Sequence, residues 1–553
     1  MTDTVVFRFD GKESTAPTGV SLAAALTAEG IRSFREGPGG SKRGMFCGMG
    51  VCQECLVDVD GHPNQRACMT KVASDLTVRT QTARPTLTAP SQVPHEPLIE
   101  APDILVVGGG VGGLSAAIAA VQQGVRVLLV DERATPGGQF YKQASAGFSV
   151  LDKQQSDGAA LLDEAVQGGV RLLDETEIWG AFTGPEIYAT RRSQAVIIRP
   201  RVLIVATGAY EQPRFVPGWQ LPGVMTTGAA QTLWRSYRTL PGRRIALFGN
   251  GPLNLQVADE LRSGGAEVLL VGEEAPAPWT RPVAALQMFM TSPGLARDGL
   301  SMLRRLQRSG VPVRFKTVLS RVEPVDGGLR ATADGAGGEV IVDAVCMNYG
   351  FQPQNEILRL LGADFSYSDR HGQLSCRRSE YFETTVEGIF AVGDCCGLGG
   401  APAAGVEGQV AGRAAAARVL GRQLVPIAGA ARRLRQHRAF QAALWRLFEA
   451  RGQGYDDIAP ETLICRCESV TRSEIDSPAE EPGAEIGGVK RATRAGMGRC
   501  QGRYCAHVLA KHMALVRGKR VDESAYFAPR VPIKPVPVAS VLAAQEASAR
   551  DET

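Results

Sequence analysis

A strand, glycine turn, helix and strand occur in this order twice in the chain, and this repeat constrains the fold more than any other feature. The first copy starts at Asp103 and reads DILVVGGG, VGGLSAAIAAVQQG and VRVLLVDE, and the second starts with RRIALFGNG at Arg243. Each is a βαβ unit of about 30 residues in which a glycine-rich turn leads from a buried strand into a helix. Two such units predict an α/β protein with two nucleotide-binding lobes.

Length, charge and hydropathy exclude several other classes of protein. A chain of 553 residues has room for two to four domains. Its 61 basic and 57 acidic side chains nearly cancel to +4, too weak a charge to indicate a nucleic-acid partner. No apolar run approaches the ~18 residues of a membrane span, and MTDTVVFRFDGK lacks the pattern of a secretory signal. We therefore expect a cytoplasmic protein without a membrane span.

The first lobe carries a complete dinucleotide motif. Gly108, Gly110 and Gly113 form G-x-G-x-x-G between a strand and a helix. Asp131, 18 residues beyond Gly113, stands where a ribose-binding carboxylate belongs, and Glu132 follows it. The pyrophosphate is expected at the helix N-terminus, where free N–H groups and the dipole favour an anion.

Later glycine-rich segments indicate that the dinucleotide is FAD, with a purely structural lobe as the alternative. These segments are the turn at Gly138 and Gln139, the strand end at Thr207 and Gly208, and the strand end at Gly393 and Asp394.

The second lobe has a damaged motif. Gly249 and Gly251 are present, but Asn254 stands where a third small residue would allow close helix packing. The next strand ends in VGEE, with Gly272 at the carboxylate position and Glu273 just beyond. Hydride transfer from NAD(P)H is therefore not expected. We interpret the second lobe as a retained structural scaffold. The alternative is that it binds an adenine nucleotide.

Twelve cysteines include two groups of four with ligand-like spacing. The first group has the plant-type C-x4-C-x2-C spacing of a [2Fe–2S] cluster and a fourth thiol further on, and it comprises Cys47, Cys52, Cys55 and Cys68. Glycines in CGMGVC let the backbone approach inorganic sulfide closely. A zinc site and free structural thiols are the alternatives.

The second group has the spacing C-x-C-x32-C-x4-C, which is that of a ligand set; a second [2Fe–2S] cluster is what the family resemblance given below implies, with zinc as the main alternative. It comprises Cys465, Cys467, Cys500 and Cys505. The segment GGQFYKQ, which follows the first βαβ unit, contains no C-x2-C or C-x4-C pair, so thiol–disulfide exchange is not expected. No motif supplies an evident substrate base, and the catalytic residues stay unknown.

These features divide the chain into eight predicted parts. They are a ferredoxin-like domain (1–82), a Pro-rich extended linker (83–101), the FAD lobe in two segments (102–240 and 341–430), the second lobe (241–340), a helical connector (431–460), a C-terminal [2Fe–2S] domain (461–520) and an extended strap with a tail (521–553).

Several of these motifs resemble known families. SKRGMFCGMGVCQECLVDVDGHPNQRACMTKV is similar to the β-grasp ferredoxin-like domain of sarcosine oxidase α chains and of hydrogen cyanide synthase. LICRCESV and GMGRCQGRYC resemble the bacterioferritin-associated-ferredoxin-like domain, with a wider last spacing. The lobes resemble two-dinucleotide-binding-domain, glutathione-reductase-like flavoproteins, and this likeness implies that Asp394 binds the ribityl chain of FAD.

Nearly the whole chain resembles the α subunit of heteromeric amine or imino-acid dehydrogenases, the group of opine oxidases, hydrogen cyanide synthase, sarcosine oxidase and proline or hydroxyproline dehydrogenases. NYGFQPQNEI and the tail segment IKPVPV are further likenesses. The resemblance implies a partner β subunit shaped like D-amino-acid oxidase with its own FAD, and often an FMN at the α–β interface. It also implies that this chain relays electrons to a quinone or cytochrome. The alternatives are a self-contained NAD(P)H-dependent ferredoxin-type reductase and a non-catalytic iron–sulfur scaffold.

Overall fold

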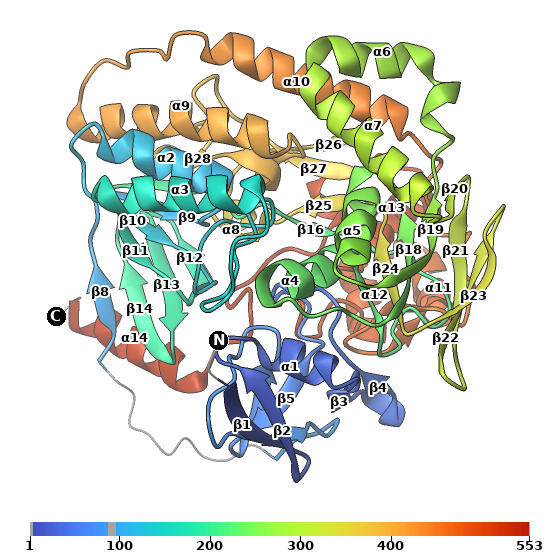
Figure 1. Ribbon diagram of the computed structural model, residues 1–553. Coiled ribbons are helices and arrows are strands. Elements are labelled where there is room, and N and C mark those ends of the chain that lie inside the picture. Colours follow the sequence, from blue (N-terminus) through green and yellow to red (C-terminus); the bar gives the residue numbers. More distant parts are fainter. Residues whose placement is uncertain (1–3, 87–95, 552–553) are drawn as a thin grey trace.

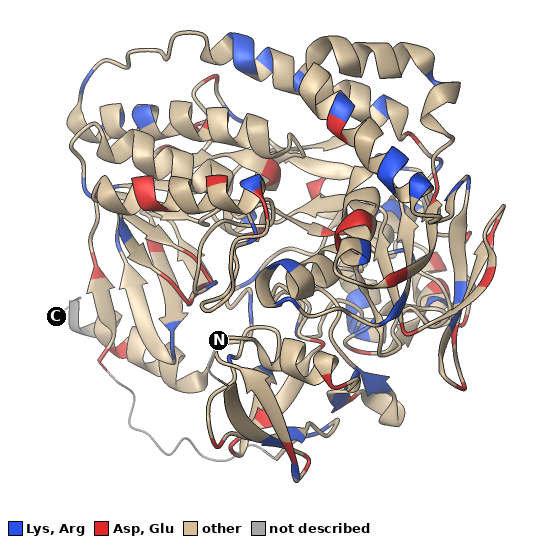
Figure 2. Ribbon diagram, in the orientation of Figure 1, with Lys and Arg blue, Asp and Glu red and all other residues tan. Residues whose placement is uncertain are grey.

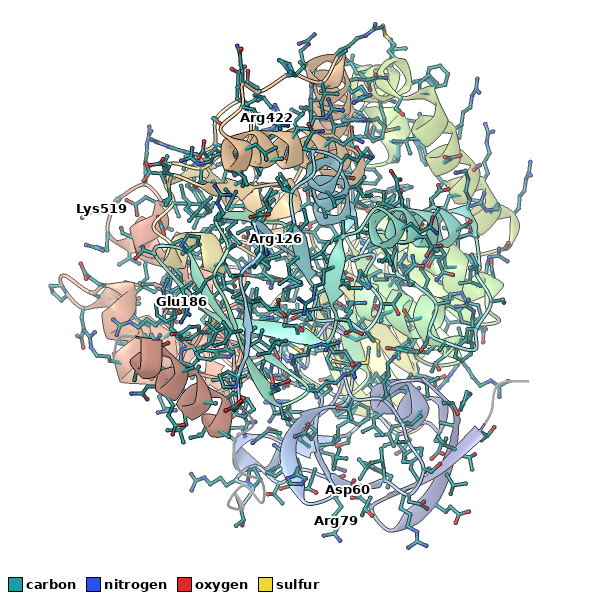
Figure 3. The ribbon with its side chains drawn as sticks, turned by 90° about the vertical axis from the view of Figure 1, so that its left-hand side faces the viewer. Asp60, Arg79, Arg126, Glu186, Arg422 and Lys519 are labelled. Atoms are coloured by element: carbon teal, nitrogen blue, oxygen red, sulfur yellow. The ribbon has the colours of Figure 1, made fainter. Side chains whose placement is uncertain are left out.

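The computed structural model describes residues 4–86 and 96–551. Figure 1 shows the small N-terminal domain at the bottom, below two larger α/β lobes, while the C-terminal segment returns past both lobes. In the side view of Figure 3, Asp60 and Arg79 lie at the outer end of the N-terminal domain, away from the lobes. The predicted α/β class is confirmed.

The N-terminal domain is a mixed sheet covered by one helix. The strand order is β2-β1-β7-β5-β6, with β1 parallel to β7 and the other neighbours antiparallel. Its elements are β1 (Thr4–Phe9), β2 (Lys12–Pro17), α1 (Leu22–Ala28), β3 (Arg35–Glu36), β4 (Lys42–Arg43), β5 (Leu56–Val59), β6 (His62–Arg66) and β7 (Thr77–Thr80). Ser21 begins α1 because its hydroxyl accepts a hydrogen bond from the Ala24 N–H.

The first lobe is a parallel sheet of order β11-β10-β9-β15-β28. Its elements are β9 (Ile104–Val107), α2 (Val111–Val121), β10 (Val127–Val130), α3 (Lys153–Gln167), β11 (Arg171–Leu173), β15 (Val202–Val205), β28 (Ile389–Ala391) and α9 (Ala401–Leu420). Helices α2 and α9 pack at backbone contact, since a Cβ on Gly408 would lie 2.2 Å from the Gly112 carbonyl oxygen. This contact joins the two sequence segments of the lobe.

The second lobe repeats this plan with strand order β17-β24-β18-β19-β20. Its elements are β17 (Val224–Thr226), α4 (Thr227–Tyr237), β18 (Arg244–Gly249), α5 (Pro252–Ser263), β19 (Glu267–Glu273), α6 (Pro282–Thr291), α7 (Pro293–Arg308), β20 (Val313–Phe315) and β24 (Ala344–Asn348). An antiparallel sheet lies beside it, with strands β21 (Val318–Val325), β22 (Gly328–Asp334) and β23 (Gly338–Val342). Between the lobes lie β16 (Ala209–Glu211), β25 (Phe351–Pro353), α8 (Glu356–Leu360), β26 (Phe365–Ser368) and β27 (Gln373–Cys376).

Two segments that the sequence predicts to be extended contain regular structure. In the linker, β8 (Leu98–Glu100) adds a parallel strand to β14 (Gln194–Ile198), beside β12 (Thr176–Phe182) and β13 (Glu186–Arg191). The remainder of the predicted linker lies in part outside the described residues. In the tail, α14 (Val538–Asp551) is a helix, because its alanines favour helix and Ala544 and Ala547 pack on Trp179 and Ile197.

The C-terminal segment is mainly helical. It comprises α10 (Ala430–Leu447), β29 (Leu463–Cys465), β30 (Val470–Thr471), α11 (Arg472–Glu480), α12 (Ile486–Thr493) and α13 (Ala506–Val516). Thr471 and Glu474 form the capping box that begins α11. In the ribbon of Figure 2, positions of basic and of acidic residues are interspersed along the chain. Among the described residues, no helix combines the length and the apolar character needed to cross a bilayer.

A buried ionic network fastens the N-terminal domain to the C-terminal segment. The Glu54 carboxylate, 1% exposed, lies 3.1 Å from Arg35, 3.7 Å from Arg43 and 3.6 Å from Arg466. The Arg466 guanidinium also lies over the rings of Phe46, at 4.0 Å, and Trp219, at 4.8 Å. One buried carboxylate thus pairs with arginines from both ends of the chain.

Glu54→Gln should therefore destabilise the docking of these two parts. Breaking a buried pair leaves uncompensated charge, and here three arginines lose one partner, so we expect a loss of about 3–5 kcal/mol in urea-induced unfolding at pH 7. Asp157→Asn, which removes an exposed i,i+4 pair with Lys153, is the control and should leave the unfolding midpoint unchanged. Equal midpoints for Glu54→Gln and the wild type would contradict this role for the network.

Candidate cofactor sites

One cavity of about 620 Å³ runs between the two lobes and collects most of the predicted nucleotide-binding residues. From the first lobe these are Gly108, Gly110, Asp131, Glu132, Gly138, Gln139, Thr207, Gly208, Gly393 and Asp394, and from the second lobe Gly251. Gly113 and Gly249 do not line the cavity. They pack against the backbone of Gly108 and of Asn348, respectively. The first and last of these residues, Gly108 and Asp394, are more than 280 positions apart in the sequence, and the fold brings them to the wall of one cavity.

The glycines of the first turn are required by close backbone contacts. A Cβ on Gly113 would lie 1.8 Å from the Gly108 carbonyl oxygen, and one on Gly108, where φ is +103°, would lie 2.5 Å from that of Ala206. Gly110 precedes α2, and only the Gly138 Cα lies within 4 Å of the position of its missing Cβ. This leaves an open cradle at a helix N-terminus, which fits a pyrophosphate.

Asp131 holds the glycine turn. Its Oδ2 accepts a hydrogen bond from the Gly109 N–H at 2.6 Å, and its Oδ1 accepts one from the Arg133 N–H at 2.8 Å. Burial raises the pKa of this carboxyl, and the two N–H donors oppose the rise. Each oxygen retains a second lone pair for a ribose hydroxyl.

The C-terminal tail supplies a lysine to this end of the cavity, which sequence reasoning missed. Lys534 Nζ lies 2.6 Å from the Glu132 carboxylate and 3.5 Å from that of Glu177. Burial alone would raise the pKa of Glu132, but Lys534, together with Arg66 and Arg133, outweighs it and the pKa is lowered. The tail is tied in by Arg503, which donates to the Ile533 carbonyl at 3.1 Å. The only sequence signal was the IKPVPV likeness.

Asp394 organises the opposite end of the first lobe. Its Oδ1 accepts hydrogen bonds from the N–H groups of Gly399 and Gly400, both at 2.9 Å, at the start of α9. Burial raises its pKa, against the effect of these donors. Thr207 donates to the Gln354 carbonyl at 2.6 Å, and Gly208 has φ +75°. The geometry fits a flavin dinucleotide lying along the lobe.

In the second lobe, Glu273 is the acidic residue that corresponds to Asp131. The sequence spacing places the corresponding position at Gly272. The Gly251 N–H donates to Glu273 at 2.9 Å and the Ala275 N–H at 2.8 Å, which repeats the Asp131 pattern. Alignment by counting fails because a bulge lies between β18 and β19, where Ile245 pairs with Val268 but Ala246 pairs with Leu270. Burial raises the pKa of Glu273 to about 8.

The N-terminal cysteine group lies in a buried loop with two left-handed glycines. Gly48 and Gly50 have φ of +61° and +77°. The N–H groups of Met49 and Cys52 point at the Cys47 sulfur at 3.5 and 3.4 Å, and the Cys68 N–H points at the Cys55 sulfur at 3.5 Å. N–H donors aimed at sulfur stabilise thiolates and suit cluster ligands.

The C-terminal cysteine group is also gathered into one place. The Cys467 and Cys500 sulfurs are 3.2 Å apart, and all members but the half-buried Cys467 are buried. Across the described residues, no three His, Cys, Asp or Glu side chains are arranged as ligands of a single metal ion. A [2Fe–2S] cluster makes a different demand, because its four thiolates are shared between two irons. The donor chemistry of both groups fits such a cluster.

The two cysteine groups lie next to each other. Cys52 of the first group shares one small hollow with Cys465, Cys500 and Cys505 of the second. Phe46 and Tyr504 pack edge to face beside it, with ring centroids 5.4 Å apart. On the other side, Met49 of the first loop lines the central cavity. Nothing in the sequence indicated this continuity from cavity to first group to second group.

Two dinucleotide-type lobes around one cavity, joined to cysteine-bearing domains, define a nucleotide-dependent oxidoreductase. The chain belongs to the pyridine nucleotide-disulphide oxidoreductase family, whose sequence model matches residues 102–417. A 2Fe-2S iron-sulfur cluster binding domain matches residues 2–83, and the sarcosine oxidase A3 domain matches residues 459–546. These matches imply FAD in the central domain and a 2Fe-2S cluster in the N-terminal domain.

Curated relatives carry names from the predicted group. An opine oxidase subunit of Agrobacterium tumefaciens is 29% identical over 462 residues, covering 79% of this chain and 91% of that protein. The hydrogen cyanide synthase subunit HcnB of Pseudomonas aeruginosa is 30% identical over 462 residues, covering 78% and 97%. The sarcosine oxidase alpha subunit of Rhizobium meliloti is 28% identical over 269 residues, covering 45% and 24%. The predicted family relationship is confirmed.

A solved structure shares the whole architecture. L-proline dehydrogenase from P. horikoshii superposes with a TM-score of 0.72 over 98% of both chains at 22% sequence identity. At this identity the likeness establishes the common fold.

Asp394→Ala should lower flavin retention, since it removes the acceptor that orders the Gly399–Gly400 turn as well as the proposed ribityl ligand. The measurement is flavin per chain in the purified protein, from absorbance after denaturation. Asp298→Ala on the exposed side of α7 is the control and should keep the wild-type content. Full flavin content in Asp394→Ala would show that this carboxylate is not a flavin ligand.

Proposed function

We propose that the chain is the electron-transfer α subunit of a heteromeric flavin-dependent amine or imino-acid dehydrogenase or oxidase. It receives electrons from a partner flavoprotein and relays them through FAD and two [2Fe–2S] clusters to a quinone or cytochrome. The observation that carries this proposal is that three sites adjoin in space: the central cavity, then the N-terminal cysteine group, then the C-terminal cysteine group.

The chemistry of these carriers matches that order. Bound FAD supplies the conversion between two-electron and one-electron transfer, and each [2Fe–2S] cluster accepts one electron at a time. The residues of this chain hold and shield them. The α2 N-terminus binds the pyrophosphate, Asp131 and Asp394 position the two ends of the dinucleotide, and the apolar cluster around Phe46 keeps water from the thiolates.

The amine substrate and the partner are inferred from the relatives. Their names describe subunits of an opine oxidase, a hydrogen cyanide synthase and a sarcosine oxidase. The proposed partner is a β subunit of D-amino-acid-oxidase type with its own FAD, and an FMN at the interface belongs to the same proposal. Affinity purification from the native host, followed by identification of the co-purifying chain and of its flavins, tests it. A chain that purifies without any flavoprotein contradicts it.

Serine substitutions should separate the two clusters. Cys52→Ser and Cys505→Ser should each remove about two of about four irons per chain, because each group ligates its own [2Fe–2S] cluster. Cys346→Ser, a buried cysteine outside both groups, is the matched control and should keep all the iron. Iron analysis with electron paramagnetic resonance of the reduced protein gives the readout. Unchanged iron in either variant would refute the corresponding cluster assignment.

NADH and NADPH should not reduce the purified chain. Asn254, hydrogen-bonded to Thr227 and the Asn348 carbonyl, fills the place of the small residue that the motif needs for close helix packing. Anaerobic stopped-flow mixing, followed by flavin absorbance at about 450 nm, is the measurement. Rapid flavin bleaching by either nucleotide would instead support a self-contained ferredoxin-type reductase, the second function considered for this chain.

A further inference from the structure

A buried lysine on the cavity wall is unused by the function described so far. Lys142 lies in the GGQFYKQ segment and is 2% exposed. Its Nζ donates hydrogen bonds to the Gly228 carbonyl at 3.0 Å and to the Gln231 Oε1 at 2.8 Å, both in the first turns of α4. It forms no ion pair with any residue that the structure describes. A buried amine without a paired carboxylate needs a reason to be there.

Two of the hydrogen-bonding positions of the Lys142 amine are occupied by oxygens of α4. Gln231 is fixed with its oxygen toward Lys142, because its amide N–H groups donate to Glu260 at 3.2 Å. A neutral amine has two N–H bonds and one lone pair. The Gly228 and Gln231 oxygens take both N–H bonds, so the lone pair is left free on a side chain that lines the cavity.

Charged groups face Lys142 from each neighbouring element, and two of them, Glu211 and Arg235, are already bonded to other residues. Glu211 on β16 accepts from the Gly228 N–H at 2.9 Å and from the Asn348 amide at 2.7 Å. Arg235 on α4 pairs with Asp152 and with Glu260 of α5. Arg133 comes from the adjoining loop. Burial lowers the pKa of Lys142 to about 7, although Glu211 opposes this.

The same helical turn of α4 also touches the N-terminal cysteine loop. A Cβ on Gly48 would lie 3.0 Å from the Ala229 Cα, and the Thr226 N–H donates to the Phe46 carbonyl at 2.9 Å. On the cavity side, a Cβ on Gly228 would lie 3.4 Å from Lys142 Nζ. The N-terminal cysteine loop, which is proposed to take the electrons, therefore lies on one side of the first turn of α4. The Lys142 amine lies on the other side of the same turn.

Electron transfer from flavin to clusters creates a need for a proton acceptor, and this step rests on the proposed function. A two-electron-reduced flavin that carries one proton yields oxidised flavin, two electrons and one proton. Clusters held by the two cysteine groups would take up the electrons singly and no proton, so a residue of this chain would have to accept the proton. Asp131, Asp394 and Glu132 on the wall already bind backbone N–H groups or Lys534.

We propose that the Lys142 amine, held between Gly228 and Gln231, takes up the proton that the flavin loses when its electrons pass to the N-terminal cluster. The lone pair of Nζ forms the new N–H bond, and the resulting ammonium keeps its two hydrogen bonds to α4. Above about pH 7 the amine is neutral and ready to accept, and below it the amine is already protonated. Flavin oxidation should therefore become faster as the pH rises through about 7.

The test uses the full chain with its bound cofactors, reduced anaerobically and then mixed with cytochrome c, a one-electron acceptor too large to enter the cavity. Flavin reoxidation is followed by its absorbance at about 450 nm from about pH 5.5 to about 9. We expect the wild-type rate to rise through about pH 7. In Lys142→Met it should be flat and about 100-fold slower at about pH 8. Lys153→Met, which removes an exposed lysine, is the matched control and should follow the wild type.

A second readout is independent of turnover. The midpoint potential of the flavin against pH should bend near neutrality in the wild type, and Lys142→Met should lose the bend. Lys142→Gln keeps a donor for Gly228 and replaces the methionine variant if that one releases its flavin. A wild-type bend and rate profile in both variants would overturn the inference. A wild-type chain that holds no flavin, or whose flavin passes no electrons to the clusters at any pH, would overturn the proposed function itself.

Discussion

The buried carboxylate of Glu54 is the interaction on which the arrangement of the sites depends. It lies between arginines that come from residues 35–43 and from position 466, and it is almost fully shielded from water. Charges removed from water in this way must stay paired, so the N-terminal domain and the C-terminal segment are held in one relative position. That position brings Cys52 beside Cys465 and Cys505, and so joins two cysteine groups more than 390 residues apart in sequence.

The two lobes share one local arrangement of a glycine turn and a carboxylate, but the arrangement has a different role in each lobe. In each, a carboxylate at the end of the second strand accepts hydrogen bonds from the glycine turn and from the residue two positions on. In the first lobe the turn opens into a cradle for a pyrophosphate. In the second lobe Asn254 bonds to Thr227 and to the Asn348 carbonyl and so fixes the turn to its neighbours. The same scaffold is therefore suited to nucleotide binding in one lobe and to support of the cavity wall in the other.

In the proposed mechanism, electrons and protons leave the flavin site to different groups of the protein. Met49 leads from the cavity toward the cysteine groups, while Lys142 stands on the wall formed with α4. Helix α4 contacts the cysteine loop, where Ala229 lies against Gly48, and it contacts Lys142 through Gly228 and Gln231. A single rigid helix thus fixes the distance between the group that takes the proton and the loop that takes the electrons.

The sequence by itself determined the local features, namely the βαβ units and the cysteine spacings, because these depend on residues close together in the chain. It failed at Glu273, where a bulge shifted the count, and at α14, where packing on Trp179 favoured helix. Only the tertiary structure decided that Lys534 reaches Glu132, that Lys142 meets α4 and that the cysteine groups adjoin. These contacts join positions far apart in sequence, and they are selected by burial and charge pairing across the whole fold, which no local pattern encodes.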